Sequence, residues 1–232
     1  MSSLPRFSTR FLTKIRELGR EPGRRSSLVL NLVLALALAL PLLAQSALAA
    51  ATTAAGPAAT ASHSAGAPKV GDILPDVEIQ GQPSNQHAAY LGLPEGTTSF
   101  RLSQIKAELV LVEIFSMYCP RCQAAAPKLN RVFERLKASP LGGSLKFVAL
   151  GAGNTPFEVE YFCKKHHASM PMFPDTDYTL HATFGNVGTP SFYVLRALPG
   201  GKGLKVLFAH EGQPESEDAF FEQIRRAATQ KD

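Results

Sequence analysis

The chain has 232 residues and a formal net charge of +5 at pH 7. This charge lies in the first 27 residues, where seven arginine and lysine side chains stand against two acidic ones. Residues 50–232 carry 17 charges of each sign, so the composition gives no reason to expect a nucleic-acid partner or another acidic one.

The first 49 residues are typical of an export signal. The basic start is followed by an apolar run over residues 28–43 and then by small residues at Ala47 and Ala49, an arrangement that precedes a signal cleavage site. We expect cleavage after Ala49 and export to an oxidising, periplasmic compartment. The alternative is an uncleaved signal that anchors the chain, although the apolar run is short for a spanning helix, which needs about 20 residues.

Residues 50–68 consist almost entirely of Ala, Thr, Ser, Gly and Pro. Such a segment has too few apolar side chains to fold, so we expect a flexible linker. Residues 69–232 have the composition of one globular domain that can bury a core without disulfides. We expect this domain to be monomeric.

The hydrophobic pattern of this domain predicts alternating strands and helices. In chain order these are strands over 76–80 and 109–115, a helix over 121–138, a strand over 145–151, a helix over 156–167, a helical turn over about 178–184, strands over 191–195 and 205–210, and a helix over about 217–229. Residues 81–99 are expected to form a polar loop, and Ser103 to cap a short helical turn. This order predicts an α/β sheet with helices on both faces.

The strongest functional signal is the motif C-P-R-C, from Cys119 to Cys122. It follows strand 109–115, which is apolar on both faces and should therefore be central in the sheet. Cys119 would lie at a helix N-terminus, where free N–H groups and the helix dipole favour an anion and lower the pKa of a thiol. Pro120 suits a helix start, and Arg121 adds a positive charge. Cys122 can reach back to Cys119 to close a disulfide.

Four features at fixed spacing resemble a known family. They are the C-P-R-C motif, Pro127 eight residues after Cys119, Glu113 six residues before it, and Thr189-Pro190 within "VGTPSFYVL". Together they are similar to exported thiol–disulfide oxidoreductases of the thioredoxin fold. The segments "VGDILPDVEI" and "FRLSQIKAELVLVEIFS" further resemble the redoxin branch that contains TlpA and ResA.

The resemblance, which covers residues 70–231, implies a thioredoxin fold: a central mixed sheet flanked by helices, with an N-terminal extension of redoxin type. It implies a dithiol–disulfide oxidoreductase with no cofactor beyond its own redox-active disulfide, Cys119–Cys122. The substrates would be cysteines of other exported proteins, and a membrane redox protein would recycle the enzyme. Members of this branch often serve cytochrome c maturation. Ala125, where ResA-like members often have a glutamate, counts against that role.

The resemblance also implies roles for single residues. Glu113 would transfer the proton of Cys122, since burial raises the pKa of a carboxyl toward neutral pH. Pro190 would be in the cis form opposite the disulfide, and the backbone of Thr189 would pair with an incoming chain. The residues expected to contact the substrate are Tyr118, which replaces the family's usual tryptophan, Pro120, Arg121, Thr189 and Pro190.

Other interpretations of these residues are open at this point. The cysteines could form a structural disulfide, or they could be inert in a domain that only binds polypeptides. A thiol peroxidase would need a threonine where Ser116 stands. No metal site is expected, since no second C-x-x-C is present. Glu113 could face solvent on a kinked strand, and Cys163 is either a small buried residue or a third redox thiol.

Overall fold

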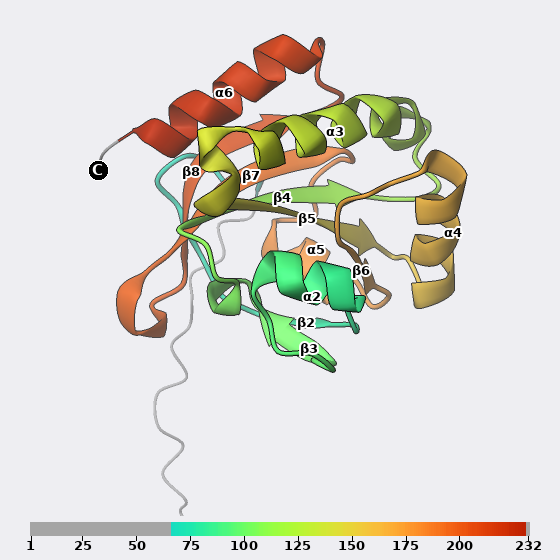
Figure 1. The fold of residues 1–232 in the computed structure, drawn as a ribbon, viewed down its shortest axis with the longest axis horizontal. Coiled ribbons are helices and arrows are strands. Elements are labelled where there is room, and N and C mark those ends of the chain that lie inside the picture. The colour runs from blue at the N-terminus through green and yellow to red at the C-terminus, as the bar shows by residue number, and fades with distance from the viewer. Residues whose placement is uncertain (1–65, 231–232) are drawn as a thin grey trace, which may run out of the picture. The chain divides into compact units, whose positions relative to one another are not determined.

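The computed structural model describes residues 66–230 (Figure 1). The predicted export signal over residues 1–49 and the part of the predicted linker up to residue 65 lie outside the described residues. The last linker residues, 66–68, are described, and Pro68 is buried. Among the described residues, no helix has the length and apolar character that crossing a membrane requires.

One six-stranded mixed sheet forms the centre of the domain, in the order β1-β8-β7-β4-β5-β6. Its strands are β1 (Ile73–Leu74), β4 (Leu109–Phe115), β5 (Leu145–Ala152), β6 (Met172–Asp175), β7 (Ser191–Ala197) and β8 (Leu204–Glu211). Strands β4, β5 and β6 run parallel, whereas β7, β8 and β1 pair in antiparallel fashion. A separate two-stranded sheet consists of β2 (Glu78–Gln80) and β3 (Ser99–Arg101).

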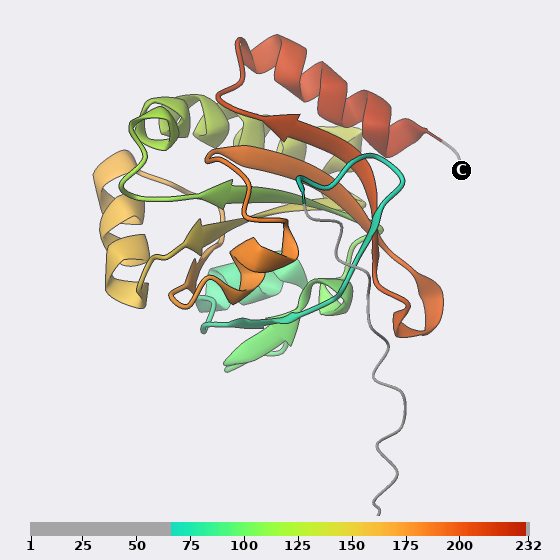
Figure 2. The same ribbon diagram turned by 180° about the vertical axis from the view of Figure 1, so that it is seen from behind.

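The α-helices are α2 (Asn85–Leu91), α3 (Pro120–Ala138), α4 (Pro156–His166), α5 (Thr179–Thr183) and α6 (Glu217–Thr229), and the short 3-10 turns are η1 (Leu102–Gln104), η2 (Pro140–Gly143) and η3 (Pro199–Gly201). Helices α3 and α6 lie on one face of the sheet, whereas α5 and the β2–β3 sheet lie on the other (Figures 1 and 2). This is the predicted arrangement of a mixed sheet with helices on both faces.

Strand β4 is central because all seven of its residues are buried and both of its edges are paired. Val110, Val112 and Ile114 pack into the core under α5, and Leu109 and Leu111 pack into the core under α3 and α6. This alternation follows the two-residue period of a strand. The prediction of a strand over 109–115 is confirmed, including its bounds.

Two predictions for the N-terminal part of the domain were wrong. Residues 81–99 are not all loop, because α2 begins after its N-cap Ser84 and ends at Leu91, before the C-cap Gly92, which adopts the left-handed conformation. Ser103 does not cap the next turn; Arg101 is the N-cap of η1, and Ser103 lies inside it.

Strand β6 was not predicted either, since Pro174 lies within it, which only an edge strand tolerates.

Helix α2 covers the part of the β5 edge that β6 leaves open. Strand β6 pairs with β5 only from Ala149 onward. The backbone N–H of the fully buried Phe147 donates instead to the Tyr90 hydroxyl, at 2.8 Å. The His87 ring and the Ser169 carbonyl, 3.2 Å apart, hold the same helix at a second point. These tertiary contacts explain a helix that its own seven residues do not predict.

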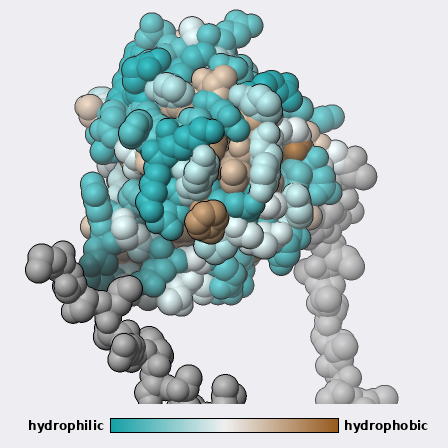
Figure 3. Space-filling view, turned by 90° about the vertical axis from the view of Figure 1, so that its right-hand side faces the viewer, coloured by the Kyte–Doolittle hydropathy of each residue, from teal (hydrophilic) through white to brown (hydrophobic). Residues whose placement is uncertain are grey.

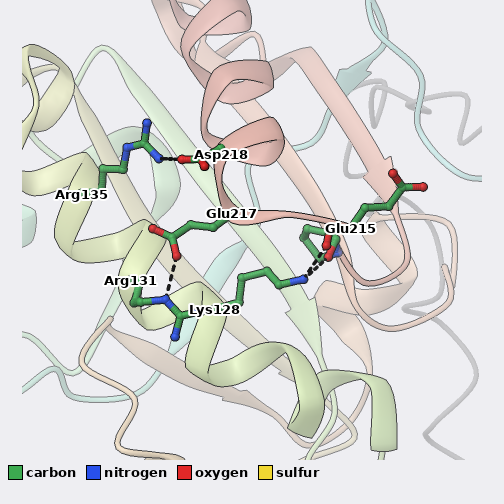
Figure 4. A network of polar contacts seen from close by, with 7 residues as sticks. Lys128, Arg131, Arg135, Glu215, Glu217 and Asp218 are labelled. Carbon is green, nitrogen blue, oxygen red and sulfur yellow. Dashed lines mark hydrogen bonds and ion pairs between the residues drawn. The ribbon is translucent and has the colours of Figure 1, made fainter.

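Helices α3 and α6 are joined at their surface by a polar network (Figure 4). Arg131 pairs with Glu217 at 2.7 Å and Arg135 with Asp218 at 2.5 Å. Lys128 donates to the carbonyls of Pro214 and Glu215, in the loop that precedes α6. Exposed ion pairs of this kind contribute little stability each, so the network fixes the position of the loop more than it stabilises the fold.

The contact between Tyr90 and β5 predicts a stability change. Tyr90→Phe removes the hydroxyl that accepts the Phe147 N–H and leaves a buried donor unpaired. We expect the free energy of unfolding to fall by about 1 to 3 kcal/mol. Urea denaturation measures this loss, with Tyr161→Phe as the matched control because Tyr161 is exposed. Equal effects of the two variants would contradict the role given to Tyr90.

Candidate active site

The C-P-R-C motif lies at the junction of β4 and α3, at the end of the sheet that Figure 3 faces. Cys119 is the N-cap of α3, and Pro120 occupies the first helical position, as the sequence predicts. The backbone N–H of Cys122 points back to the sulfur of Cys119 at 3.4 Å. The Cys119 thiol in turn donates to the Thr189 carbonyl at 3.2 Å. The sulfur is thus half-buried between a helix N-terminus and a neighbouring loop.

Two opposing effects act on the pKa of Cys119. Burial raises it, but hydrogen bonds with the Thr189 side chain, with Cys122 and with the backbone N–H of Arg121 lower it, and the net shift is downward. The N–H groups at the helix N-terminus thus add to a downward shift to which the Thr189 side chain also contributes. Arg121 contributes through its backbone N–H, and its side chain is exposed.

Cys122 has the opposite electrostatic environment. Its side chain is buried, with 1% of its surface exposed, on the inner side of α3. Burial is the main cause of a strongly raised pKa, and the charge of Glu113 adds to it. Cys122 therefore keeps its proton under conditions in which Cys119 is an anion. All three cysteines, including Cys163, are free thiols in the structure.

Glu113 lies in the middle of β4 with 3% of its surface exposed. Its strand neighbours are Ala149 on β5 and Phe192 on β7. Among residues 66–230, no group forms a hydrogen bond or ion pair with its carboxylate. Burial, with a smaller contribution from the charge of Cys119, raises the pKa of Glu113 to about 8. The alternative of a solvent-facing Glu113 is wrong, because β4 is a central strand.

The loop before β7 forms the opposite wall of the site. The Thr189–Pro190 peptide bond is cis, as the resemblance implied. Pro190 is buried and Thr189 is partly exposed next to the sulfur of Cys119. The structure thus brings these two residues together with Cys119 and Cys122.

The remaining predicted contact residues lie at the surface. Tyr118, Pro120 and Arg121 are exposed around Cys119. The Tyr118 hydroxyl donates to the carboxylate of Glu158 on α4, and this bond raises the pKa of Tyr118 and lowers that of Glu158. Apolar areas on this face of the domain are surrounded by hydrophilic side chains (Figure 3).

Sequence reasoning missed two residues that fix the turn before Cys119. The side chain of Asn154 accepts the N–H of Met117 at 2.8 Å, and the side chain of Gln123 donates to the Met117 carbonyl at 2.7 Å. Asn154 is fully buried in the loop between β5 and α4. The contacts of Asn154 and Gln123 with Met117 depend on the fold. The one signal for them in the sequence was the position of Asn154 just after a predicted buried strand.

Cys163 lies on α4 and packs against the apolar cluster that contains Cys122. Burial raises its pKa to about 11. A thiol with a raised pKa is a poor nucleophile, so these surroundings favour the interpretation of Cys163 as a small packing residue. Within residues 66–230, no group of three or more potential ligand side chains could hold a metal ion.

Solved structures share this arrangement of sheet and helices. A candidate thiol:disulfide interchange protein DsbE from Chlorobium tepidum has a TM-score of 0.52 at 21% identity, over 68% of this chain and 97% of that one. A candidate protein disulfide isomerase from Bacteroides thetaiotaomicron has a TM-score of 0.53 at 14% identity, over 70% and 91% of the two chains. At such identities the likeness shows the fold alone, which is the predicted thioredoxin fold.

The family follows from the sequence itself. The profile of the AhpC/TSA family matches residues 70–199, more than half of the chain. The chain therefore belongs to the AhpC/TSA family, which confirms the predicted resemblance to redoxins. A comparison with curated proteins gave no match.

The buried carboxyl predicts a dependence of stability on pH. Because the pKa of Glu113 is raised to about 8, the folded protein binds a proton that the unfolded chain releases near pH 4 to 5. Raising the pH from 5 to 8 therefore destabilises the reduced wild type through this group. Glu113→Gln has no such proton, so its stability relative to the wild type should increase over this range.

The expected size of this relative increase is about 3 to 4 kcal/mol, because one proton changes the free energy of unfolding by at most about 1.4 kcal/mol per pH unit. Denaturant unfolding of the reduced proteins at pH 5, 6.5 and 8 measures it. Glu160→Gln, at an exposed glutamate on α4, is the matched control and should show no such trend. A constant difference between Glu113→Gln and the wild type would mean that Glu113 titrates normally.

Proposed function

We propose that the chain is a dithiol–disulfide oxidoreductase that exchanges disulfides with cysteines of other proteins. The observation that carries this proposal is the difference in exposure and in pKa between the two thiols. Cys119 is partly exposed and its pKa is lowered, whereas Cys122, three residues later, is buried and its pKa is raised. Such a pair suits a reaction in which one sulfur attacks first and the other attacks second.

In the reducing direction, the thiolate of Cys119 attacks one sulfur of a substrate disulfide. A mixed disulfide forms and the other substrate sulfur leaves as a thiolate, which takes a proton from water. Cys122 then gives its proton to ionised Glu113 and attacks the sulfur of Cys119, which releases the second substrate thiolate. The products are a Cys119–Cys122 disulfide and a substrate that has gained two electrons. The reverse sequence oxidises a substrate dithiol.

The carboxyl of Glu113 suits both directions because its pKa is raised to about 8. Near neutral pH, most molecules hold a proton on Glu113 that can be given to Cys122 when the disulfide is reduced. A smaller ionised fraction can accept the proton of Cys122 when the disulfide forms. General acid–base groups work best with a pKa near the operating pH.

We further propose that the protein acts after export, in the periplasm, where disulfides persist. The basic and apolar pattern of the first 49 residues supports export. Its substrates would be exported proteins with cysteines, and the description of one similar structure as a candidate thiol:disulfide interchange protein is in keeping with this. A membrane redox protein would recycle the Cys119–Cys122 disulfide, and apocytochrome c is one substrate to test.

A thiol peroxidase is the second candidate, because the chain belongs to the AhpC/TSA family. In that reaction the Cys119 thiolate would reduce a peroxide, giving a sulfenic acid and an alcohol or water, and Cys122 would displace water from it to form the disulfide. Ser116 stands where such enzymes carry a threonine, so we expect peroxide to be a poorer substrate than a disulfide. Rapid oxidation by peroxide, faster than by a peptide disulfide, would favour this second function.

The exchange proposal predicts which variant traps a substrate. Cys122→Ala leaves the Cys119 thiolate free to attack but removes the second thiol, so mixed disulfides with a protein substrate should accumulate. Cys119→Ala should form none. Non-reducing gels and mass spectrometry of the adduct, before and after treatment with dithiothreitol, measure the outcome.

The matched control is Cys163→Ser in the Cys122→Ala background, and it should trap as much substrate as Cys122→Ala alone. Loss of trapping in this control would make Cys163 a third redox thiol. No adduct with any disulfide-containing protein, together with tight non-covalent binding of polypeptides, would instead support the binding module with inert cysteines.

A further inference from the structure

The loop that ends in Pro190 has an unusual pattern of hydrogen bonds. Four successive carbonyls each accept one donor: Val187 from the His181 ring at 2.7 Å, Gly188 from the Ser191 hydroxyl at 2.6 Å, Thr189 from the Cys119 thiol at 3.2 Å, and Pro190 from the Gly212 N–H at 2.8 Å. The position of this loop is therefore determined at every residue.

One of these four donors changes during thiol–disulfide exchange. When Cys119 loses its proton or forms a disulfide, its sulfur no longer donates to the Thr189 carbonyl. The other three donors have no part in the redox reaction, so the loop stays in place while this carbonyl becomes free. The freed carbonyl can then accept an N–H group from the backbone of a substrate chain next to Cys119.

His181 is the residue that ties the loop to a separate part of the fold. It lies on α5, and its own backbone N–H donates to Asp175 at the end of β6, at 2.7 Å. Asp175 is buried and also accepts the N–H of Leu180 at 2.9 Å. The His181 carbonyl accepts the N–H of Asn186 at 3.1 Å. His181 is therefore anchored to β6 through its backbone N–H and to the loop through its ring.

The chemistry of this contact fixes the proton on the ring. A backbone carbonyl can only accept a hydrogen bond, so the Nε2 atom of His181 must carry a hydrogen. The hydroxyl of Ser191 comes from the residue that follows the loop, and Gly212 follows Glu211, which pairs with Ser191. Apart from Cys119, His181 is thus the one side chain from another element that holds these carbonyls among the described residues.

We propose that His181 is a positioning residue for the substrate polypeptide. It holds the Val187 carbonyl and thereby aims the Thr189 carbonyl at the place beside Cys119 where a substrate backbone binds. This inference rests on the proposed function, because it concerns how the same site recognises a peptide disulfide. A small disulfide without backbone N–H groups makes no use of this contact, so it should be insensitive to His181.

The test compares two disulfides reduced by the reduced protein: insulin, whose disulfides lie in peptide chains, and hydroxyethyl disulfide, which has no peptide groups. For His181→Ala we expect the KM for insulin to rise about fivefold, the factor that corresponds to the loss of one ordinary hydrogen bond. The kcat/KM for hydroxyethyl disulfide should stay within about twofold of the wild type. His181→Gln retains an N–H donor with similar reach and should restore most of the insulin KM.

The matched control is His87→Ala, which removes a ring-to-carbonyl contact of the same kind on α2. It should leave both substrates unaffected. If His181→Ala does not fold, His181→Asn serves in its place, since its side chain is polar but too short to reach Val187.

Several results would overturn the proposal. These are an unchanged KM for insulin in His181→Ala, an equal loss with both disulfides, and a His181→Gln variant as impaired as His181→Ala. A wild type that reduces neither disulfide would refute the proposed function itself. This outcome differs from a fully active wild type whose KM for insulin is unchanged by His181→Ala, which would refute only the role of His181.

Discussion

The first turn of α3 has backbone N–H groups without carbonyl partners in the helix, and the sulfur of Cys119 accepts one of them. This contact helps to lower the pKa of Cys119, while burial raises the pKa of Cys122, and the site depends on this difference between the two thiols. The central position of β4 makes the contact possible. Because β4 is buried on both faces, its C-terminal end has a fixed position, and α3 begins only four residues later.

The same architecture explains why an acid is tolerated inside the sheet. Glu113 has no partner among the described residues, so burial favours its protonated form and raises its pKa to about 8. A neutral carboxyl is far less costly to bury than a carboxylate. Since Cys122 is buried nearby and its pKa is also raised, the two groups can share a proton that solvent reaches poorly. Glu113 thus lowers the free energy of unfolding as the pH rises toward 8, the range in which it can transfer a proton.

Local signals in the sequence were sufficient for β4, α3 and α6. The apolar run over 109–115, Pro120 at the helix start and the spacing of the last helix all act within a few residues, and the structure places these elements where they were predicted. Helix α2 and strand β6 could not be predicted, because α2 depends on contacts with β5 and β6 contains a proline. The roles of Asn154 and His181 depend on backbone groups far away in the sequence.

The central claim is most directly tested by titrating the thiols of the reduced protein through the thiolate absorbance near 240 nm, with Cys122→Ala and Cys119→Ala variants to assign each transition. The account predicts that Cys119 ionises below the ordinary cysteine pKa of about 8.5 and that Cys122 ionises well above it. A Cys119 that titrates at or above that ordinary value, or two thiols that ionise together, would contradict it.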